Sequence, residues 1–223
     1  MKHSAERSEA YVLYSIMKIP NCKKEKKLLL DGYDLVAGID EAGRGAWAGP
    51  IVAGAVLITP ENIKHAKQNW LIRDSKLLCP KDRQKAFDFI KNNFEYAVGV
   101  VDSSIIDTKG LNFSNQLVMD RALEALNASP GFIFVDGRGF YFEQNYENVI
   151  HGDEKIFSIA AASIVAKVIR DKIMDQWHEI YNAFGFYKNK GYGTKFHYQM
   201  IKKHGICSIH RRSYAPIHRL LSS

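Results

Sequence analysis

The chain has 223 residues, which is enough for one substantial domain with its own hydrophobic core. Its 46% hydrophobic content is ordinary for a globular protein, no apolar run approaches the length of a membrane span, and no signal peptide is recognisable. The three cysteines are far apart and odd in number, which argues against a disulfide framework and indicates a reducing compartment, so we expect a cytoplasmic protein.

The net charge of +7 is distributed unevenly along the chain. Residues 1–30 carry a net charge of +4 and residues 188–223 a net charge of +8 without a single acid, whereas residues 31–187 come to −5. A polyanion held at basic flanks, over a cluster of acids that bind cations, would produce this pattern. We therefore favour a nucleic acid as the ligand over the alternative that the basic segments are only solvated tails.

Residues 1–30 show no clear core pattern and are interpreted as an N-terminal extension. Their charge run at residues 23–27 predicts an exposed helical turn with a solvated face. The domain is expected to begin near Asp31–Asp34 and to comprise residues 31–223.

The stretch from residue 35 to residue 50 carries the strongest chemical signal. Its apolar residues 35–39 predict a buried strand, which ends in two adjacent acids, Asp40 and Glu41. Carboxylates at the end of a buried strand are costly unless a metal or another partner offsets their charge. Three glycines flank the next charged residue, Arg44, and would let a ligand approach the backbone closely. The pattern predicts a metal-dependent site beside a loop that faces a polyanion.

One alternative is a dinucleotide site, because residues 43–48 match the relaxed pattern G-x-G-x-x-A. That pattern must open a helix, whose N-terminus holds the pyrophosphate. Here Gly49 and Pro50 follow at once, and the β-branched residues of 51–58 predict a second strand. A β-hairpin in place of the required helix argues against dinucleotide binding.

Helices and strands alternate through the middle of the chain, as the spacing of the apolar residues indicates. We expect helices over residues 80–94 and 114–126 and strands over 96–101, 132–135 and 146–150. A polar connection before the first of these helices contains Asp74-Ser75-Lys76, in which Lys76 either contacts a phosphate or faces water.

Two more acids follow predicted strands. Asp136 precedes a glycine at the end of the strand over 132–135, which repeats the arrangement at Asp40, and Asp153 follows the segment 146–150. Because ligands gather at the carboxyl ends of strands in open α/β sheets, Asp136 would lie near Asp40. An aspartate before a glycine also caps turns, and this alternative stays open.

Residues 158–181 form the clearest helical segment, with apolar residues at every fourth position. Lys167 and Asp171 lie four residues apart on it, so an ion pair is the ordinary explanation for Asp171. Lysines, glycines and aromatic residues then interleave in a predicted loop at 187–194, a composition that suits contact with a nucleic-acid strand. A helix over 194–204 follows, with a threonine as its N-cap.

A zinc site is a further alternative near the C-terminus, where the candidate ligands are His197, His204, Cys207, His210 and His218. Their spacing fits none of the usual ligand pairs and offers only one cysteine, so we do not expect structural zinc. The order of the elements, a β-hairpin followed by alternating helices and strands, predicts an α/β fold with a mixed sheet flanked by helices.

Asp40, Glu41, Asp136 and Asp153 form the predicted chemical centre. Four carboxylates without histidine or cysteine partners favour hard cations, Mg²⁺ or Mn²⁺. Two such ions about 4 Å apart can activate a water and stabilise the leaving oxygen in phosphodiester hydrolysis. Neighbouring strand residues point to opposite faces, so Asp40 and Glu41 are expected to share a site only if the strand bends at its end.

Ten short segments occur in an order that is highly specific, although each alone is only suggestive. They are residues 39–45 (Ile-Asp-Glu-Ala-Gly-Arg-Gly), 48–50, 74–76, 135–137, 152–153, 158–164, 166–168, 170–171, 190–194 (Lys-Gly-Tyr-Gly-Thr) and 210–214 (His-Arg-Arg-Ser-Tyr). In this order the chain resembles the bacterial type 2 ribonucleases H, the ribonuclease HII family, over nearly all of residues 31–216.

The resemblance implies a ribonuclease H-like fold, with a mixed five-stranded sheet flanked by helices and a helical, substrate-binding C-terminal region at about residues 185–223. It implies an Mg²⁺- or Mn²⁺-dependent endonuclease that cleaves RNA paired with DNA, including single ribonucleotides embedded in duplex DNA. Cleavage would leave 5′-phosphate and 3′-hydroxyl ends. We expect a monomer that acts on these nucleic acids without a membrane.

The resemblance also assigns the four carboxylates. Asp40, Glu41 and Asp136 would be the principal metal ligands, and Asp153 would complete the set. Asp171 would at most support this site without binding the metal.

The family's glycine–arginine–glycine loop corresponds to Gly43, Arg44 and Gly45, which would contact the ribonucleotide and its 2′-hydroxyl, the group that distinguishes RNA from DNA. The tyrosine that recognises the junction corresponds to Tyr192, which would stack on the neighbouring deoxyribose. Lys76 would bind the substrate as well.

Two alternatives stay open. Type 3 ribonucleases H need runs of ribonucleotides and carry serine and lysine in the first motif, where this chain has Ala42 and Arg44. A non-catalytic nucleic-acid binder that uses the basic ends is the other. The segment 46–48, Ala-Trp-Ala, departs from the family, where a smaller or leucine-type residue is expected, and this affects packing more than chemistry.

Overall fold

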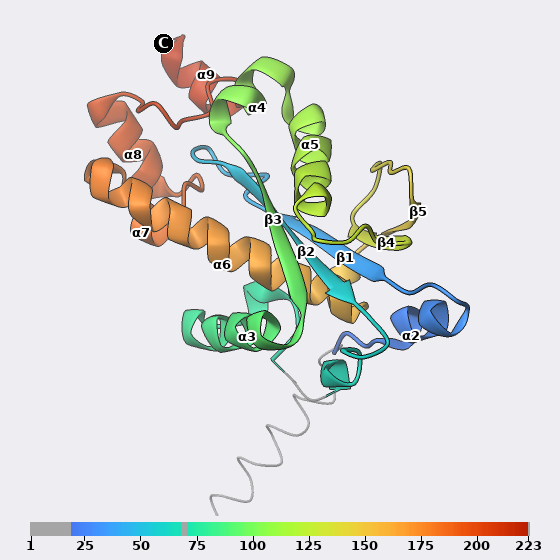
Figure 1. Ribbon diagram of the computed structural model, residues 1–223. Coiled ribbons are helices and arrows are strands. Elements are labelled where there is room, and N and C mark those ends of the chain that lie inside the picture. Colours follow the sequence, from blue (N-terminus) through green and yellow to red (C-terminus); the bar gives the residue numbers. More distant parts are fainter. Residues whose placement is uncertain (1–18, 68–70, 223) are drawn as a thin grey trace, which may run out of the picture.

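The structure, a computed structural model, describes residues 19–67 and 71–222. It contains one five-stranded sheet with helices on both faces, and further helices extend it at the C-terminal end of the chain (Figure 1). The predicted mixed sheet flanked by helices is confirmed. None of the helices in the described part of the chain combines the length and the apolar character that crossing a membrane requires.

The strand order across the sheet is β3-β2-β1-β4-β5. The antiparallel half consists of β1 (Val36–Ala42), β2 (Ile51–Ile58) and β3 (Glu95–Val101). The parallel half is formed by β1 with β4 (Phe132–Asp136), and by β4 with β5 (Asn145–Val149). β1 is therefore the central strand, and its end lies beside the end of β4.

Both faces of the sheet are covered, which explains why all eight residues of β2 are buried. On one face, β2 contributes Val56 and Ile58 to a core with α6 (Phe157–Ile180) and α3 (Pro80–Asn93). On the other face, its alternate residues pack in a second core with α4 (Ser103–Lys109) and α5 (Leu111–Glu124). The β-branched run that predicted this strand is the composition of a strand buried on both sides.

The helix α6 lies directly against β1, which carries Asp40 and Glu41, and against β2 (Figure 1). A Cβ atom at Gly38 of β1 would be 2.2 Å from the backbone carbonyl carbon of Ser158, and one at Gly54 of β2 would be 2.5 Å from the carbonyl oxygen of Ala162. Small residues on both sides therefore permit this close approach.

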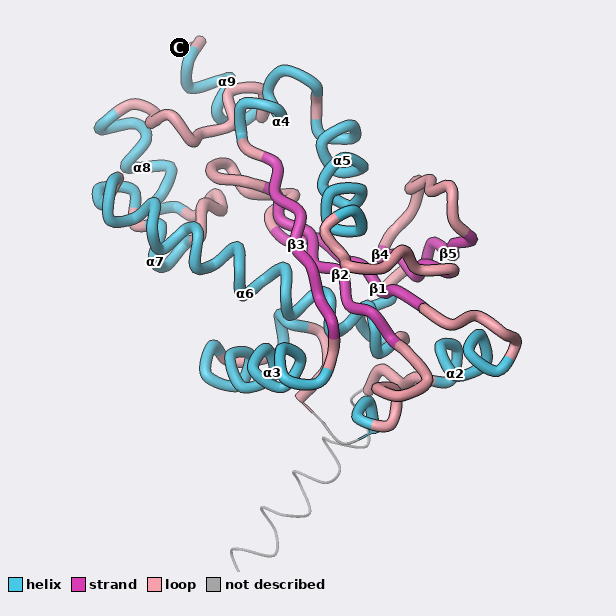
Figure 2. Tube along the Cα trace, viewed as in Figure 1, coloured by secondary structure: helices cyan, strands magenta, loops and turns pink. Residues whose placement is uncertain are grey.

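The C-terminal helices form a third layer against the second half of α6 (Figure 2). These are α7 (Phe186–Asn189), α8 (Lys195–His204) and α9 (Ala215–Leu221). Their shared core includes Met174 of α6 and Ala48 of the loop after β1. The predicted helical C-terminal region is confirmed, although Phe186–Asn189 is helical where we expected a loop to begin near residue 187, and α4 and α9 were not predicted.

The helix α2 (Lys23–Leu30) corrects the interpretation of residues 23–27 as a solvated face. Glu25 is completely buried, and its Oε1 accepts a hydrogen bond of 2.9 Å from the backbone N–H of Ser158, in the first turn of α6. Its Oε2 has no partner among the described residues. Burial raises the pKa of Glu25, and the N-terminus of α6 is a favourable location for its negative charge.

Candidate active site

The carboxylates of β1 and β4 leave the sheet at the same edge. The two strands are parallel, with Ile39 opposite Val135, so the residues that follow these two are Asp40 and Asp136. Asp40 is buried and Asp136 half-buried. The parallel pairing that brings carboxyl ends together thus places these two acids side by side.

Glu41 borders the same cavity as Asp40, which we expected only if the strand bends at its end. β1 stays paired with β2 through Ala42 opposite Val52, so Asp40 and Glu41 both lie within a regular strand. The pairing of β1 with β4 stops at Ile39, however, which leaves the other side of β1 without a neighbouring strand from Asp40 onward. A cavity at this open side borders both acids, although their side chains start from opposite faces of the strand.

Asp136 is held to the segment that carries Asp153. One carboxylate oxygen of Asp136 accepts a hydrogen bond of 2.7 Å from the backbone N–H of Gly152. A Cβ at Gly152 would lie 2.5 Å from Ile159 and 3.3 Å from the Asp136 oxygen, so a glycine is required for this contact. Asp153 follows in a short 3₁₀ turn, Gly152–Glu154, and is buried.

The four carboxylates repel one another in a poorly solvated place. Burial, then the charges of Glu41, Asp136 and Asp153, raises the pKa of Asp40 well above its usual value. Burial also raises the pKa of Glu41 to about 7, against the opposing effect of Arg44. The pKa of Asp153 is raised by burial and by Asp136. Such a group of acids is stable in its charged form only when cations offset it.

The donor set fits Mg²⁺ or Mn²⁺. It offers carboxylate oxygens alone, which hard divalent cations prefer, and burial with mutual repulsion raises the pKa of Asp40 and Glu41, a penalty on the charged forms that a bound cation would offset. In the residues that the structure describes, no three His, Cys, Asp or Glu side chains already converge on one point as a finished metal site. Asp40, Glu41 and Asp136 border a cavity of about 530 Å³, which leaves room for hydrated ions.

Eight of the nine predicted site residues line this cavity, namely Asp40, Glu41, Gly43, Arg44, Gly45, Lys76, Asp136 and Tyr192. The ninth, Asp153, is connected to it through Lys76, whose Nζ is 3.6 Å from a carboxylate oxygen of Asp153. Burial lowers the pKa of Lys76, but the charges of Asp74, Asp153, Asp40 and Asp136 together raise it by more, so the lysine is held in its charged form.

Two buried arginines hold the loop that contains Arg44. Arg211 donates hydrogen bonds to the carbonyl oxygens of Arg44 (2.9 Å) and Gly49 (2.9 and 3.0 Å). Arg170 donates to the carbonyl oxygens of Pro50 (3.0 Å) and Ala48 (3.3 Å). Their partners are carbonyl oxygens and, for Arg211, also the hydroxyl of Tyr214 (2.7 Å), so these bonds hold the backbone of the loop from beneath.

Tyr192 also lines this cavity, from the loop between α7 and α8. Its ring centroid lies 5.2 Å from the guanidinium carbon of Arg170 and 5.9 Å from Nζ of Lys167, and 37% of the residue is exposed. One face of the ring is thus supported by cations while part of it remains free to contact a ligand.

The cavity also has a basic part that the sequence analysis did not identify. Arg83 and Lys167 line it, and both form ion pairs with Asp171, at 3.5 and 2.7 Å. The hydroxyls of Ser75 and Ser163 meet there at 2.8 Å. Asp171 thus forms the predicted ion pair with Lys167, and a second one with Arg83. Arg83 belongs to a helix recognised only by its apolar spacing, so nothing in the sequence connected it to the site.

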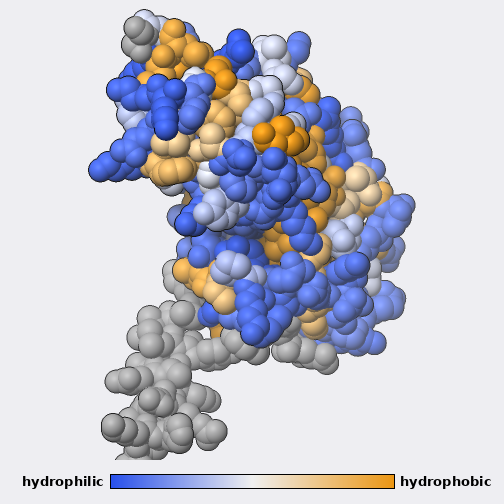
Figure 3. Space-filling model, turned by 90° about the vertical axis from the view of Figure 1, so that its left-hand side faces the viewer, coloured by the Kyte–Doolittle hydropathy of each residue, from blue (hydrophilic) through white to orange (hydrophobic). Residues whose placement is uncertain are grey.

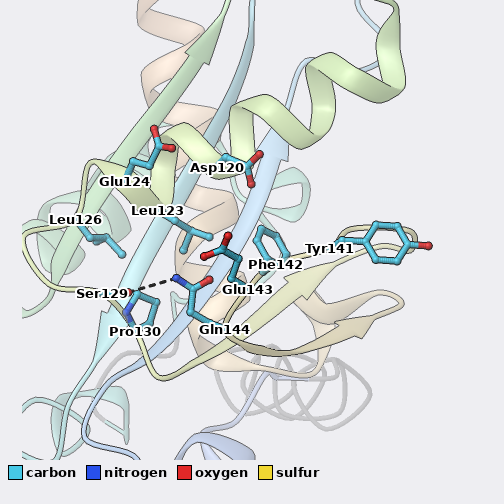
Figure 4. A pocket seen from close by; sticks show the side chains of 10 residues that line it. All are labelled: Asp120, Leu123, Glu124, Leu126, Ser129, Pro130, Tyr141, Phe142, Glu143 and Gln144. Atoms are coloured by element: carbon cyan, nitrogen blue, oxygen red, sulfur yellow. Dashed lines mark hydrogen bonds between the residues drawn. The ribbon is translucent and has the colours of Figure 1, made fainter.

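A second cavity of similar volume, about 550 Å³, shares no residue with the acidic one (Figure 4). It lies between α5, which supplies Asp120, and the segment before β5, which supplies Gln144. Figure 4 shows Tyr141 pointing away from the other side chains. Its size alone does not connect it with the chemistry of the carboxylates.

Solved structures share this fold. Ribonuclease H2 from Pyrococcus horikoshii OT3 superposes with a TM-score of 0.71 and 28% identity, covering 84% of this chain and 97% of that chain. The five-stranded sheet and its acidic edge therefore define a metal-dependent endonuclease of the ribonuclease H class. A family model described as ribonuclease HII matches residues 37–217.

Two curated relatives agree with this match. Ribonuclease HII of Thermotoga petrophila is 42% identical over 190 residues, which are 85% of this chain and 77% of that protein. Ribonuclease HII of Caldicellulosiruptor bescii is 43% identical over 196 residues, 85% of this chain and 91% of that protein. The chain belongs to the ribonuclease HII family, and it is a divalent-metal-dependent endoribonuclease that acts on RNA–DNA hybrids.

Proposed function

We propose that the protein incises DNA duplexes on the 5′ side of single embedded ribonucleotides, in addition to the RNA strand of RNA–DNA hybrids. One observation carries this proposal: the acidic edge of the sheet, the Arg44 loop and Tyr192 border the same cavity. A site that accepts an isolated ribonucleotide must hold the scissile phosphate and recognise one 2′-hydroxyl together, and this cavity offers groups of both kinds.

Asp40, Glu41, Asp136 and Asp153 would hold the metal ions in our proposal. When bound, two Mg²⁺ or Mn²⁺ ions supply an activated water and stabilise the leaving oxygen. The expected products carry 5′-phosphate and 3′-hydroxyl ends. The raised pKa values of Asp40 and Glu41 support this assignment, because they identify negative charge that requires a cation.

The remaining predicted residues would position the nucleic acid. Gly43, Arg44 and Gly45 would contact the ribonucleotide with backbone N–H groups and the arginine side chain. Tyr192 would stack on the deoxyribose at the junction, and Lys76 would meet a phosphate. The support for Lys76 is its charged state next to Asp153, at the border of the cavity. We further propose that the protein is a cytoplasmic monomer.

The test is a cleavage assay on a DNA duplex with one embedded ribonucleotide, with Mg²⁺ or Mn²⁺ and with a chelator. We expect incision 5′ to the ribonucleotide only when metal is present. Asp40→Asn should abolish incision while binding of the duplex survives, because the variant removes a metal ligand and not the basic contacts.

Two outcomes would favour the alternatives. Incision of long hybrids without incision at a single ribonucleotide would indicate an enzyme of the type 3 kind. Unchanged behaviour of Asp40→Asn would indicate a nucleic-acid binder in which the acids have no catalytic part.

A further inference from the structure

Two buried histidines form a hydrogen-bonded pair that does not border the acidic cavity. The Nε2 atoms of His197, on α8, and His210 are 3.0 Å apart, and the residues are 0% and 1% exposed. Rings of Phe184, Phe186 and Trp47 surround them, with the ring centroids of Phe184 and His210 4.9 Å apart. Two imidazoles enclosed in this way require partners for all of their nitrogen atoms.

The partners determine the direction of every hydrogen bond in the pair. Nδ1 of His197 is 2.9 Å from the carbonyl oxygen of Tyr192, which only accepts, so this nitrogen carries the proton. Nε2 of a neutral His197 then accepts from Nε2–H of His210. Nδ1 of His210 in turn accepts the backbone N–H of Cys207 at 2.9 Å. One unbroken chain of hydrogen bonds thus runs from Cys207 to the backbone of Tyr192.

This series of hydrogen bonds can form only when both histidines are neutral. Burial lowers the pKa of His197, and burial together with His197 lowers the pKa of His210 to about 4. Besides the aromatic rings, the polar neighbour at the pair is Cys207, whose Sγ is 3.1 Å from Nδ1 of His210 and whose pKa is raised by burial to about 11. A proton added to either ring would remove an acceptor from the chain.

In the loop that carries Tyr192, the two preceding residues are hydrogen-bonded to the loop after β1 and to α6. The carbonyl oxygen of Gly191 accepts from the N–H groups of Trp47 (2.8 Å) and Ala48 (3.2 Å), and that of Lys190 accepts from Arg170 (2.9 Å). The carbonyl oxygen of Tyr192 accepts from the backbone N–H of Thr194 (2.9 Å) and, from α8, from His197 (2.9 Å). The histidine pair therefore joins the C-terminal segment to the one residue of the loop whose ring borders the cavity.

We propose that His197, supported by His210, is a positioning residue for Tyr192. The backbone of Tyr192 also has local hydrogen bonds to Asn189 and Thr194, and the bond from His197 adds a connection to α8 that restrains the direction in which the ring leaves the loop. Neither histidine touches the substrate. The inference rests on the proposed contact of Tyr192 with the sugar at the junction, and it adds the device that holds this ring in place.

A pair of variants separates positioning from packing. His197→Asn retains a nitrogen donor near the Nδ1 position, whereas His197→Gln retains a polar atom near the Nε2 position and loses the donor to Tyr192. Both remove the ring, so both lower the melting temperature. Two quantities are measured for each variant: the incision rate at an embedded ribonucleotide and the affinity for an all-DNA duplex. After correction for any change in this affinity, we expect His197→Gln to lower the incision rate about tenfold and His197→Asn to lower it by no more than about twofold.

Equal losses from the two variants, in proportion to their melting temperatures, would overturn the proposal, because packing alone would then explain them. The same measurements in a Tyr192→Ala background complete the test. There His197→Gln should cause no further loss, since the ring that it positions is absent.

The outcomes also distinguish a failure of the role proposed for Tyr192 from a failure of the role proposed for His197. If Tyr192→Ala leaves incision unchanged relative to duplex affinity, the proposed role of Tyr192 is wrong, and the role of His197 with it. If Tyr192→Ala is impaired but His197→Gln is normal, or if the two losses multiply fully, only the positioning role of His197 is wrong.

Discussion

At the scale of single residues, the fold keeps four carboxylates close together at the acidic edge of the sheet although their charges repel one another. Asp40 is buried beside three other carboxylates, and Lys76 is the one cation at hydrogen-bonding or ion-pairing distance that the described residues provide, at 3.6 Å from Asp153. The folded chain without metal is therefore under electrostatic stress that protons or divalent cations relieve. Stability should consequently depend on pH and on metal in a connected way.

The metal-free protein should lose stability as the pH rises from about 4.5 to about 7. Glu41 has its pKa raised from 4.5 to about 7 by folding, so the folded state binds the extra proton at low pH and releases it across this range. We therefore expect Mg²⁺ to raise the melting temperature more at pH 7.5 than at pH 5, measured by thermal unfolding. Glu41→Gln should flatten the pH dependence, and an equal effect of metal at both pH values would contradict this account.

At the scale of elements, α2 and α6 are joined by one carboxylate. Glu25 reaches from α2 to the first turn of α6, where free N–H groups and the helix dipole favour a negative charge. α6 in turn lies against β1 and β2. The position of the long helix, and with it the packing behind Asp40, therefore depends on a contact between residues that are 133 positions apart.

Glu25→Ala should lower the free energy of unfolding by about 1–3 kcal/mol, because a buried N–H of α6 loses its partner. Glu25→Gln keeps an acceptor at this position and should recover most of the loss. Lys27→Ala, at an exposed position on the same helix, is the matched control and should be close to neutral. Urea unfolding measures all three, and an effect of Lys27→Ala as large as that of Glu25→Ala would argue against a specific contact.

Periodic apolar patterns predicted the sheet strands and the long helices, because a strand buried on both faces and a helix with one buried face impose those patterns. They did not predict α4, whose seven residues are too short for a period and whose Asp107 accepts hydrogen bonds from the backbone of Arg212 and Ser213. Glu25 was misinterpreted because its hydrogen-bond partner, like those of Asp107, lies far away in the sequence.

The residues of the candidate site likewise fall into two groups, those that the sequence predicted and those that it did not. Its acids and glycines stand next to strand ends and are recognisable from the sequence. Arg83 and Lys167 come from the faces of two helices, α3 and α6, and enter the cavity only because those helices pack on the same side of the sheet. The backbone contacts of Arg170 and Arg211 likewise depend on tertiary structure, although both residues belong to segments that carry the family resemblance.

At the scale of the whole molecule, positive charge gathers in the C-terminal helices, beyond the acidic edge. Residues 188–223 carry eight Lys or Arg and no acid. The face shown in Figure 3 is mostly hydrophilic, with hydrophobic side chains exposed among hydrophilic ones in its upper part, where these helices lie. Such a surface suits the backbone and the sugars of a duplex, and its contribution should be governed by counterion release.

Lys202→Ala with Lys203→Ala should weaken binding of the duplex most at low salt. Both residues are exposed on α8, so removing two phosphate contacts should reduce the slope of log K against log salt by about 2 and leave kcat at saturating substrate unchanged. Lys23→Ala with Lys27→Ala, exposed on α2 at the other end of the sheet, is the charge-matched control. Binding titrations at several salt concentrations measure the slope, and identical slopes for the two double variants would rule out a special role for α8.

The segment Trp47-Ala48-Gly49 has a consequence for how this enzyme can be rebuilt. Its backbone is bonded on one side to Gly191 and on the other to Ile209 and Arg211, at distances between 2.8 and 3.2 Å. A Cβ at Gly193 would lie 2.1 Å from the Trp47 ring. Three pieces of chain that are remote in sequence thus form one interlocked unit, and a graft of this loop between relatives would have to carry all three together.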